Sequence, residues 1–426
     1  MLIEFSVTNY RSIFDRQTLN MAASSCFKEY ETSNTFMLEQ DERVPRLLRS
    51  SVLYGPNASG KSTLIQALQF MEGQVLSSQR ESQAGDEIDV VPFKLTEKTR
   101  LADSEFEISF IELGVRYDYG FRCNRMRFTE EWLFAYPFGR AQKWFHRVFD
   151  VQEGKDVYKF SNSFSGGRQR QSWATQTRPN ALFLSTAIQL NNEQLMPAFN
   201  WFKLRLRIFD SKGLSPGYTL GRCKEDDDRV RVVEFMNSAD LSISDIQIRE
   251  TIFTADALPK GMPAAIKDDF LKDMAGKKFV EPRFFHKDVD TQELIEFDED
   301  EESDGTRALF AFAGPWLDMI ENERVFVVDE LDTSLHPLLV HYLVKRLHQS
   351  GTKAQLIFTT HDTTLLSQKL MRRDQVWFLE KDSQSATFLY PLSDFSPREN
   401  EAVERGYLNG RYGGIPFLKE LDFYGV

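Results

Sequence analysis

The chain has 426 residues, of which 41% are hydrophobic and 27% charged, an ordinary composition for a soluble globular protein with a sizeable core. Its formal net charge of −12 disfavours indiscriminate binding to nucleic acid. No apolar stretch approaches the length of a membrane span, and the first residues alternate like a strand instead of forming a secretory signal. Three widely separated cysteines, Cys26, Cys123 and Cys223, predict a cytoplasmic protein without structural zinc.

The first predicted element is a β-hairpin over residues 1–23. Ile3, Phe5 and Val7 alternate with polar residues, which is the period of a half-buried strand, and the segment RQTLNMA returns beside it. We therefore expect an antiparallel pair at the start of the chain.

The next element, residues 51–68, reads SVLYGPNASGKSTLIQAL and has the Walker A order of strand, loop and helix. Two glycines without a Cβ allow the backbone to wrap closely around a phosphate, and the positive end of the following helix faces the anion. Lys61 is predicted to reach the β- and γ-phosphates of ATP, and the Ser62 hydroxyl to ligate Mg²⁺. A glycine-rich turn before an ordinary helix is the alternative, which the complete motif in its required context disfavours. The predicted nucleotide-binding residues here are Gly55, Pro56, Asn57, Ala58, Ser59, Gly60, Lys61, Ser62 and Thr63.

The middle of the chain predicts strands first and helices later. Alternating runs over 87–160 indicate a substantial antiparallel sheet, residues 179–207 look helical, and 208–290 read as short helices and polar loops. No repeat or long heptad run occurs, so a long coiled-coil arm is not expected. The basic segments GRQRQ (167–171) and KLRLR (203–207) are potential footholds for nucleic acid, although solvated surface or helix-face charge is the commoner explanation.

A second set of catalytic residues is predicted near the C-terminal end. The apolar run RVFVVDE (324–330) ends in two acids, as a Walker B strand does. Asp329 is predicted to hold the magnesium shell, and Glu330 to act as general base on the attacking water. After one helix, a further strand ends at His361. This order is that of an ABC-type ATPase, whose switch histidine contacts the γ-phosphate.

An ABC-type ATPase also needs a signature loop, and two segments of the sequence are candidates for it. SGGRQRQ begins at Ser165, and ESDGTRALF contains Ser303 and Gly305. The signature must begin the helix that runs into the Walker B strand, and Ser303 precedes Asp329 by 26 residues, whereas Ser165 precedes it by 164. We therefore assign Ser303 and Gly305 to the signature, where the helix N-terminus can face a phosphate.

With these pieces in order, the chain resembles the ABC ATPases of the RecF and SMC class, and more closely the compact bacterial ATPases typified by RloA and the abortive-infection protein AbiL. The residues that carry this resemblance are NYRSI (9–13), YGPNASGKST (54–63), PFKL (92–95), SDGT (303–306), VVDELDTSLHP (327–337), FTTHD (358–362) and YLNGRYGGIPFL (407–418).

The resemblance implies an α/β P-loop fold of the ABC head type, with an antiparallel β-subdomain, a helical insert and no long coiled coil. It divides the chain into an N-terminal head part (1–86), a β-rich subdomain (87–175), a variable insert (176–295) and a C-terminal head part (296–426). It places Arg11 near the nucleotide and the D-loop at Ser334 to His336, and it leaves the Q-loop ligand near PFKL unassigned. Two heads would hold two ATP molecules between them, with Ser303 of one facing Lys61 of the other.

The function expected from this resemblance is an ATPase that senses and regulates a partner effector, such as a nuclease or an RNA-cleaving toxin encoded nearby, in antiphage defence. A RecF-like clamp on DNA is the main alternative, and the acidic balance weighs against it. A nuclease of the OLD type would need a further acidic metal-binding domain, and a transporter ATPase would need a more typical signature. The acidic cluster Asp298 to Glu302 could bind a divalent metal, but an acidic run is more commonly a solvated loop.

Overall fold

The computed structural model describes residues 1–38, 44–210, 214–239, 241–252, 278–333, 335–366, 370–397 and 401–415. The chain forms two compact units. The first comprises Met1–Ser211, Met319–Asp332 and Val340–Val426, and the second comprises Lys212–Asp318 and Thr333–Leu339.

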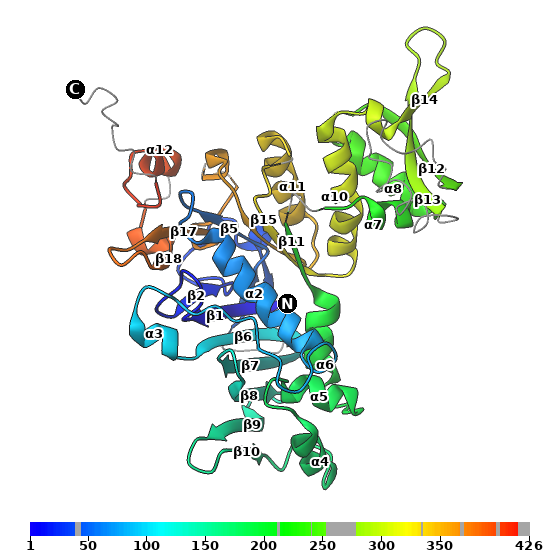
Figure 1. The fold of residues 1–426 in the computed structure, drawn as a ribbon. Helices are drawn as coiled ribbons and strands as arrows, with labels where there is room; N and C mark the ends of the chain where they lie inside the picture. Colours follow the sequence, from blue (N-terminus) through cyan, green and yellow to red (C-terminus); the bar gives the residue numbers. More distant parts are fainter. Residues whose placement is uncertain are drawn as a thin grey trace, which may run out of the picture. The chain divides into compact units, whose positions relative to one another are not determined.

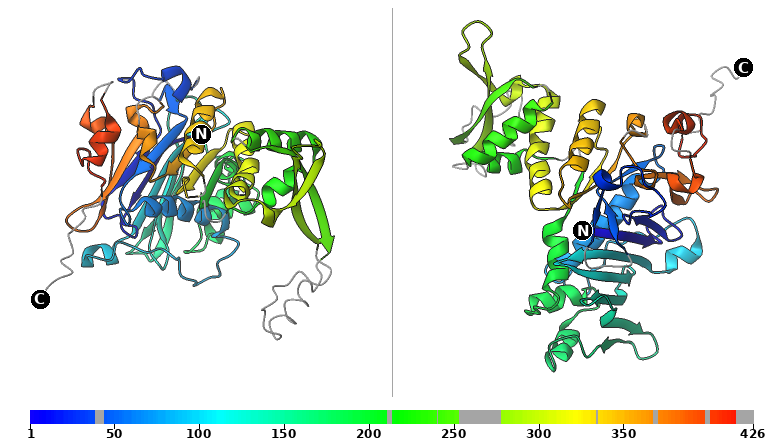
Figure 2. Two further views of the ribbon diagram at one scale, coloured as in Figure 1. Left: turned by 90° about the horizontal axis from the view of Figure 1, so that it is seen from above. Right: turned by 180° about the vertical axis from the view of Figure 1, so that it is seen from behind.

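The first unit contains a seven-stranded antiparallel sheet in the order β10-β9-β8-β7-β6-β1-β2 (Figures 1 and 2). Its strands are β1 (Leu2–Thr8), β2 (Gln17–Asn20), β6 (Ser104–Glu112), β7 (Val115–Cys123), β8 (Phe128–Tyr136), β9 (Gln142–Asp150) and β10 (Lys155–Phe160). The predicted N-terminal hairpin is confirmed, since β1 pairs with β2. On its other side β1 pairs with β6, so the start of the chain and the β-rich region share one sheet.

A six-stranded sheet in the order β11-β15-β16-β5-β17-β18 forms the other layer of this unit. Its strands are β5 (Ser50–Tyr54), β11 (Leu206–Asp210), β15 (Val325–Asp329), β16 (Gln355–Thr359), β17 (Val376–Lys381) and β18 (Thr387–Pro391). All neighbours are parallel except β17 and β18. The end of the segment read as helical is in fact β11, which pairs with the Walker B strand.

Helix α2 (Lys61–Ser77) lies between the two sheets. Its buried residues, which include Leu64, Leu68 and Met71, belong to one apolar cluster with side chains of β1, β6 to β9, β5 and β15. This cluster fixes the start of α2 against the end of β5. Other helices and short strands of the unit include α1 (Glu31–Asn34), β3 (Thr35–Met37), β4 (Arg46–Leu48), α3 (Glu97–Leu101), α4 (Gln169–Gln176), α5 (Phe183–Gln189), α6 (Met196–Asn200), the π-helix η1 (Trp201–Arg205) and α12 (Val403–Leu408).

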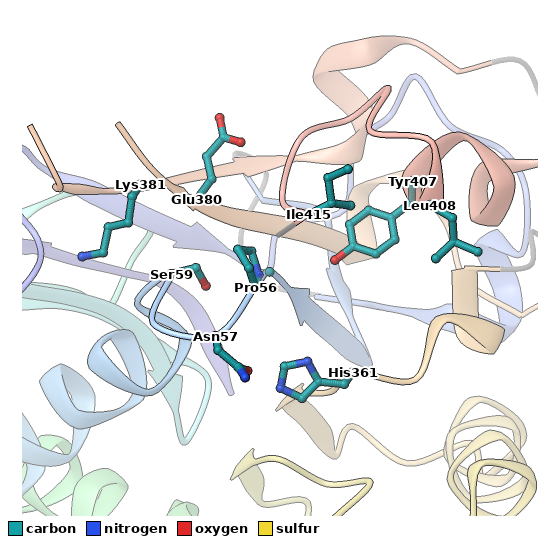
Figure 3. Close-up of a pocket in the computed structure, with 10 residues that line it drawn as sticks. Pro56, Asn57, Ser59, His361, Glu380, Lys381, Tyr407, Leu408 and Ile415 are labelled. Atoms are coloured by element: carbon teal, nitrogen blue, oxygen red, sulfur yellow. The ribbon is translucent and has the colours of Figure 1, made fainter. Parts of the chain in front are cut away.

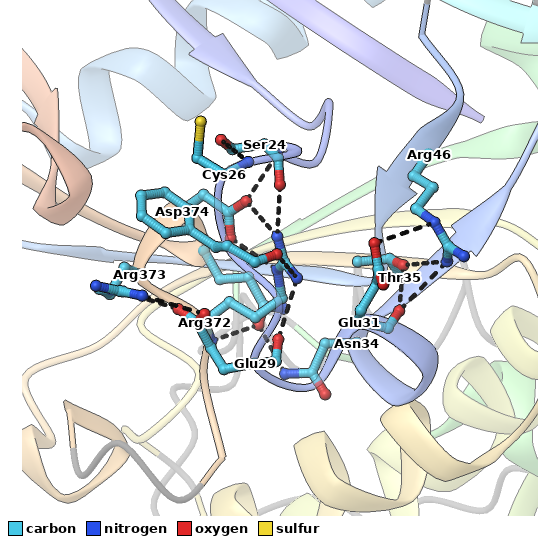
Figure 4. A network of polar contacts seen from close by, with 12 residues as sticks. Ser24, Cys26, Glu29, Glu31, Asn34, Thr35, Arg46, Arg372, Arg373 and Asp374 are labelled. Atoms are coloured by element: carbon cyan, nitrogen blue, oxygen red, sulfur yellow. Dashed lines mark hydrogen bonds and ion pairs between the residues drawn. The ribbon is translucent and has the colours of Figure 1, made fainter. Parts of the chain in front are cut away.

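A buried arginine ties the segment before α1 to the turn before β17 (Figure 4). Arg372 is 1% exposed and pairs with Asp374 at 2.8 Å. Its guanidinium also donates to the backbone carbonyls of Ser24, Phe27 and Glu29 at 3.0 to 3.1 Å. Because every donor direction is used by backbone or carboxylate, this charge is stabilised in spite of its burial.

The second unit combines helices with a small antiparallel sheet in the order β12-β13-β14. Its elements are α7 (Gly217–Arg222), α8 (Asp226–Asn237), β12 (Ile243–Ile252), β13 (Lys278–Lys287), β14 (Leu294–Asp298) and most of α10 (Asp304–Glu321). Phe284 of β13 packs edge-on against Phe310 of α10, with the two ring centroids 5.4 Å apart. The expectation of only helices and loops over 208–290 was therefore wrong, because β12 and β13 are strands.

The fold confirms the predicted class, an α/β P-loop fold with an antiparallel sheet and several helices. Among the described elements, the longest helix is α10 with 18 residues, so the described chain contains no long coiled-coil arm. No described helix is both long and apolar enough to cross a bilayer. Helix α11 (Pro337–Gln349) lies between β15 and β16 in the chain.

Candidate nucleotide-binding site

The loop between β5 and α2 lies close to neighbouring strands at its two glycines. Gly60 has φ 110°, and a Cβ there would lie 2.1 Å from Oγ1 of Thr387. A Cβ on Gly55 would lie 2.4 Å from the carbonyl oxygen of Leu379. Both positions therefore require glycine, one for its backbone angle and both for the close approach of β17 and β18.

Lys61 is held against this loop. The side chain is 7% exposed, and its Nζ donates to the carbonyl oxygens of Gly55 at 2.7 Å and Pro56 at 3.2 Å. Burial lowers the pKa of Lys61, and the nearby carboxylates of Asp329, Glu330 and Asp332 oppose that shift. The lysine of one motif and the acids of the other, far apart in the sequence, thus lie within each other's electrostatic field.

One buried hydroxyl positions both predicted acids. Thr359, at the end of β16, donates from Oγ1 to Oδ1 of Asp329 at 2.6 Å and accepts from the backbone N–H of Glu330 at 2.7 Å. Glu330 has φ 53°, an unfavourable value for a residue with a side chain. The hydrogen bond from the Glu330 N–H to Thr359 helps to hold this turn. The role of Thr359 was not predicted from the sequence.

His361 lies beside the loop, as predicted from its place after β16. Its backbone N–H donates to Oδ2 of Asp332 at 3.1 Å. Its exposed side chain and that of Asn57 point toward one another (Figure 3). The histidine is thus anchored through its backbone while its imidazole remains accessible.

Two hydroxyls brace the loop from the side of β18 and the N-terminal hairpin. Thr387 donates from Oγ1 to the carbonyl oxygen of Ser59 at 2.9 Å. Ser12 lies 2.8 Å from the Thr387 hydroxyl and donates to Oγ1 of Thr63 at 3.2 Å. Sequence reasoning missed Ser12 and Thr387, although Ser12 lies inside the quoted segment NYRSI.

Arg11, the neighbour of Ser12, has its side chain against Tyr10. Its Nε donates to the Tyr10 hydroxyl at 3.2 Å, and the guanidinium carbon lies 5.6 Å from the ring centroid. Its backbone N–H donates to the carbonyl oxygen of Val91 at 2.7 Å. The structure therefore brings the residue after Arg11, and not the Arg11 side chain, into hydrogen-bond contact with the loop and α2.

A pocket of about 610 Å³ lies beside the loop (Figure 3). It is lined by Gly55, Pro56, Asn57, Ser59, His361, Glu380, Lys381, Tyr407, Leu408 and Ile415. The last three residues belong to the C-terminal segment, which Tyr407 closes by donating to the carbonyl oxygen of Gly414 at 2.8 Å. Residues 416–418 of the segment YLNGRYGGIPFL lie outside the described residues.

The predicted signature residues lie in the second unit. Ser303 precedes α10, and its Oγ accepts from the backbone N–H of Thr306 at 3.1 Å, while Gly305 is the second residue of the helix. Ser165, the competing position, lies in a loop of the first unit before the eight-residue α4. Of the predicted D-loop, Ser334 lies outside the described residues, and His336 accepts from the backbone N–H of Leu338.

These residues fit a magnesium-bound nucleotide triphosphate. The 17-residue α2 begins at the loop with no acidic residue in its first turn, so its positive end can face a phosphate. Ser59 is 1% exposed, and its hydroxyl has no hydrogen-bond partner among the described residues. The described chain has no cluster of three or more His, Cys, Asp or Glu residues that could hold a metal.

A glycine-rich loop joining a parallel strand to a helix, with paired acids at the end of a nearby parallel strand, defines an α/β protein of the P-loop class. The family model described as "AAA domain, putative AbiEii toxin, Type IV TA system" matches residues 50–367. This match covers about three quarters of the chain, and the protein belongs to this AAA-domain family.

Solved structures with a similar chain include the SMC head domain from Thermotoga maritima, with 12% identity, a TM-score of 0.40, and coverage of 92% of this chain and 98% of that chain. Another is the SmcHead bound to the C-winged helix domain of ScpA, with 12% identity, a TM-score of 0.42, and coverage of 92% and 97%. No curated protein matches the chain.

Proposed function

We propose that this protein binds ATP with Mg²⁺ and hydrolyses it to ADP and phosphate. The observation that carries the proposal is that β16 pairs with both β5 and β15, so that the loop leading to Lys61 and the acids Asp329 and Glu330, which one buried hydroxyl orients, follow neighbouring strands of one sheet. Bound Mg²⁺ would neutralise charge on the phosphates. Ser62 and Asp329 would hold the ion, and the loop from Gly55 to Thr63 would hold the phosphates.

Within this proposal, the side chains have separate tasks. Glu330 accepts the proton of the attacking water, and its fixed backbone points the carboxylate in one direction. His361 contacts the γ-phosphate, and Arg11 binds at the nucleotide after leaving Tyr10. Ser303 and Gly305 of a second copy complete the site, so the active species is an ATP-sandwich homodimer. Each subunit has the domains 1–86, 87–175, 176–295 and 296–426.

We further propose that the ATPase regulates a partner effector protein encoded nearby, in abortive infection of phage-infected cells. The family description, which names a toxin–antitoxin system, supports this role, as does the resemblance to RloA and AbiL. Three free cysteines, Cys26, Cys123 and Cys223, support action in the cytoplasm.

Two variants test the ATPase. Lys61→Ala should abolish nucleotide binding, because the loop loses the ammonium group that the carbonyl oxygens of Gly55 and Pro56 hold against it. Glu330→Gln should bind ATP with wild-type affinity and fail to hydrolyse it, because the phosphate cradle is unchanged. Hydrolysis by Glu330→Gln at the wild-type rate would contradict the assignment of the general base.

The regulatory role is tested by purifying Glu330→Gln from its native host with ATP and Mg²⁺, and by identifying protein and nucleic acid in the eluate. A stoichiometric protein encoded beside this gene would support the sensor and regulator. Nucleic acid without such a protein would favour a DNA-binding clamp instead.

A further inference from the structure

The hairpin of β13 and β14 in the second unit extends past the rest of that unit (Figure 1). The pairing of Lys287 with Leu294 closes it, and the turn is tied by the N–H of Asp288, which donates to the carbonyl oxygen of Glu293 at 2.8 Å. β14 is the last strand in the order β12-β13-β14, so no described strand pairs with its outer edge.

The register identifies which backbone groups face that edge. In an antiparallel ladder, hydrogen-bonded pairs alternate with pairs whose N–H and C=O groups point away from the partner strand. Asp288 and Glu293 form a hydrogen-bonded pair, so the N–H and C=O groups of Leu294 and Glu296 face outward. The N–H of Asp298, which has the same direction, donates to Oε2 of Glu301 at 2.7 Å and so ends the open edge.

The side chains around this edge are apolar and acidic. Val289 is 89% exposed, Leu294 51% and Ile295 43%. From 287 to 298 the sequence has five acids and a single lysine. The acids are Asp288, Asp290, Glu293, Glu296 and Asp298, of which the last two pair with Arg283.

We propose that the outer edge of β14 binds an extended segment of a partner protein, rich in lysine or arginine and interrupted by apolar residues, which adds a strand to this sheet. Backbone hydrogen bonds to Leu294 and Glu296 provide the pairing, and the exposed apolar side chains provide contact area. The acids select a basic segment. A second copy of this chain is disfavoured as the occupant, because pairing two β14 edges would set like charges against one another.

This inference adds the chemistry of a partner to the proposed function and rests on it for that partner's role. Nucleic acid is the less favourable ligand, since its phosphates would be repelled by the same acids. Binding is measured without nucleotide, so a failure here is separate from a failure of ATP hydrolysis.

The test uses the full chain and a short fluorescent peptide of alternating lysine and valine, with fluorescence anisotropy as the readout. Leu294→Pro removes an outward N–H at the first residue of an edge strand, where proline leaves the β13 ladder intact. It should weaken peptide binding by about tenfold, the loss expected for one backbone hydrogen bond and strand fit. Leu294→Thr keeps the N–H and serves as the matched control, with at most about a threefold loss expected.

Two further peptides separate charge from backbone pairing. An alternating glutamate and valine peptide should not bind, and a lysine and valine peptide with N-methylated backbone amides should lose most of its affinity. Hydrogen exchange of residues 294–298 should slow when the first peptide is added. Absence of binding by that peptide, or equal binding to the Pro and Thr variants, would overturn the proposal.

Discussion

Replacing Thr359 with valine should uncouple ATP binding from hydrolysis. Valine has nearly the same shape as threonine and lacks the hydroxyl that holds Asp329 at 2.6 Å and the N–H of Glu330 at 2.7 Å. Thr359 is fully buried, so water does not replace the lost partner. The turn at Glu330, with φ 53°, then loses a hydrogen bond that supports it.

The magnitude follows from these two bonds. A hydrogen bond to a charged carboxylate contributes about 1.5 to 3 kcal/mol and a neutral one about 1 kcal/mol, so the variant should lose about 2.5 to 4 kcal/mol of unfolding free energy. Displacing a residue that orients catalytic or metal-binding side chains typically lowers activity about 10- to 100-fold. The affinity for ATP should change less, because Lys61 and the glycine loop are untouched.

Urea denaturation measures the loss of unfolding free energy. Single-turnover kinetics measure the rate of hydrolysis, and titration calorimetry measures the affinity for ATP. Thr359→Ser keeps the hydroxyl and is the matched control. Wild-type hydrolysis by Thr359→Val would refute the argument, and so would an equal loss in Thr359→Ser.

Three further predictions concern the loop, a buried acid and the signature. Gly60→Ala should lose ATP binding and about 2 to 4 kcal/mol of stability, because of its φ of 110° and a neighbouring side chain 2.1 Å from the added Cβ. Gly73→Ala in α2, the helix that follows Gly60, adds a Cβ that meets nothing within 4 Å and should instead stabilise the protein by about 1 kcal/mol. Calorimetric ATP binding and urea denaturation compare the two variants. Burial raises the pKa of Glu72 from 4.5 to about 7, so the folded chain holds this proton more tightly than the unfolded chain. The stability that this bound proton contributes is fully present below about pH 4.5 and is lost as the pH rises through about 7. In denaturation titrations, the unfolding free energy of Glu72→Gln should therefore gain on the order of 1 to 3 kcal/mol relative to wild type across that window. A difference between the two proteins that does not depend on pH would contradict this prediction. Ser303→Arg should bind ATP as a monomer but fail to form the ATP-dependent dimer in light scattering, and normal dimers would return the signature to Ser165.

Much of the fold could be predicted because its signals are local. The alternation of Ile3, Phe5 and Val7 predicts a strand, and the glycine spacing from Gly55 to Gly60 predicts a phosphate loop. Strand β12 was not predicted, although Ile246 and Ile248 alternate with polar residues, because its geometry depends on pairing with β13, which follows after a long gap in the chain.

The sequence by itself determined the order of phosphate loop, paired acids and histidine along the chain. Only the tertiary structure decided how these residues are supported. Thr387 reaches the loop across 328 residues and Ser12 across 51, and Thr359 reaches the acids across 30. Such partners leave no periodic pattern, because a single hydroxyl in the right place depends on which strands become neighbours, and that depends on burial summed over the whole core.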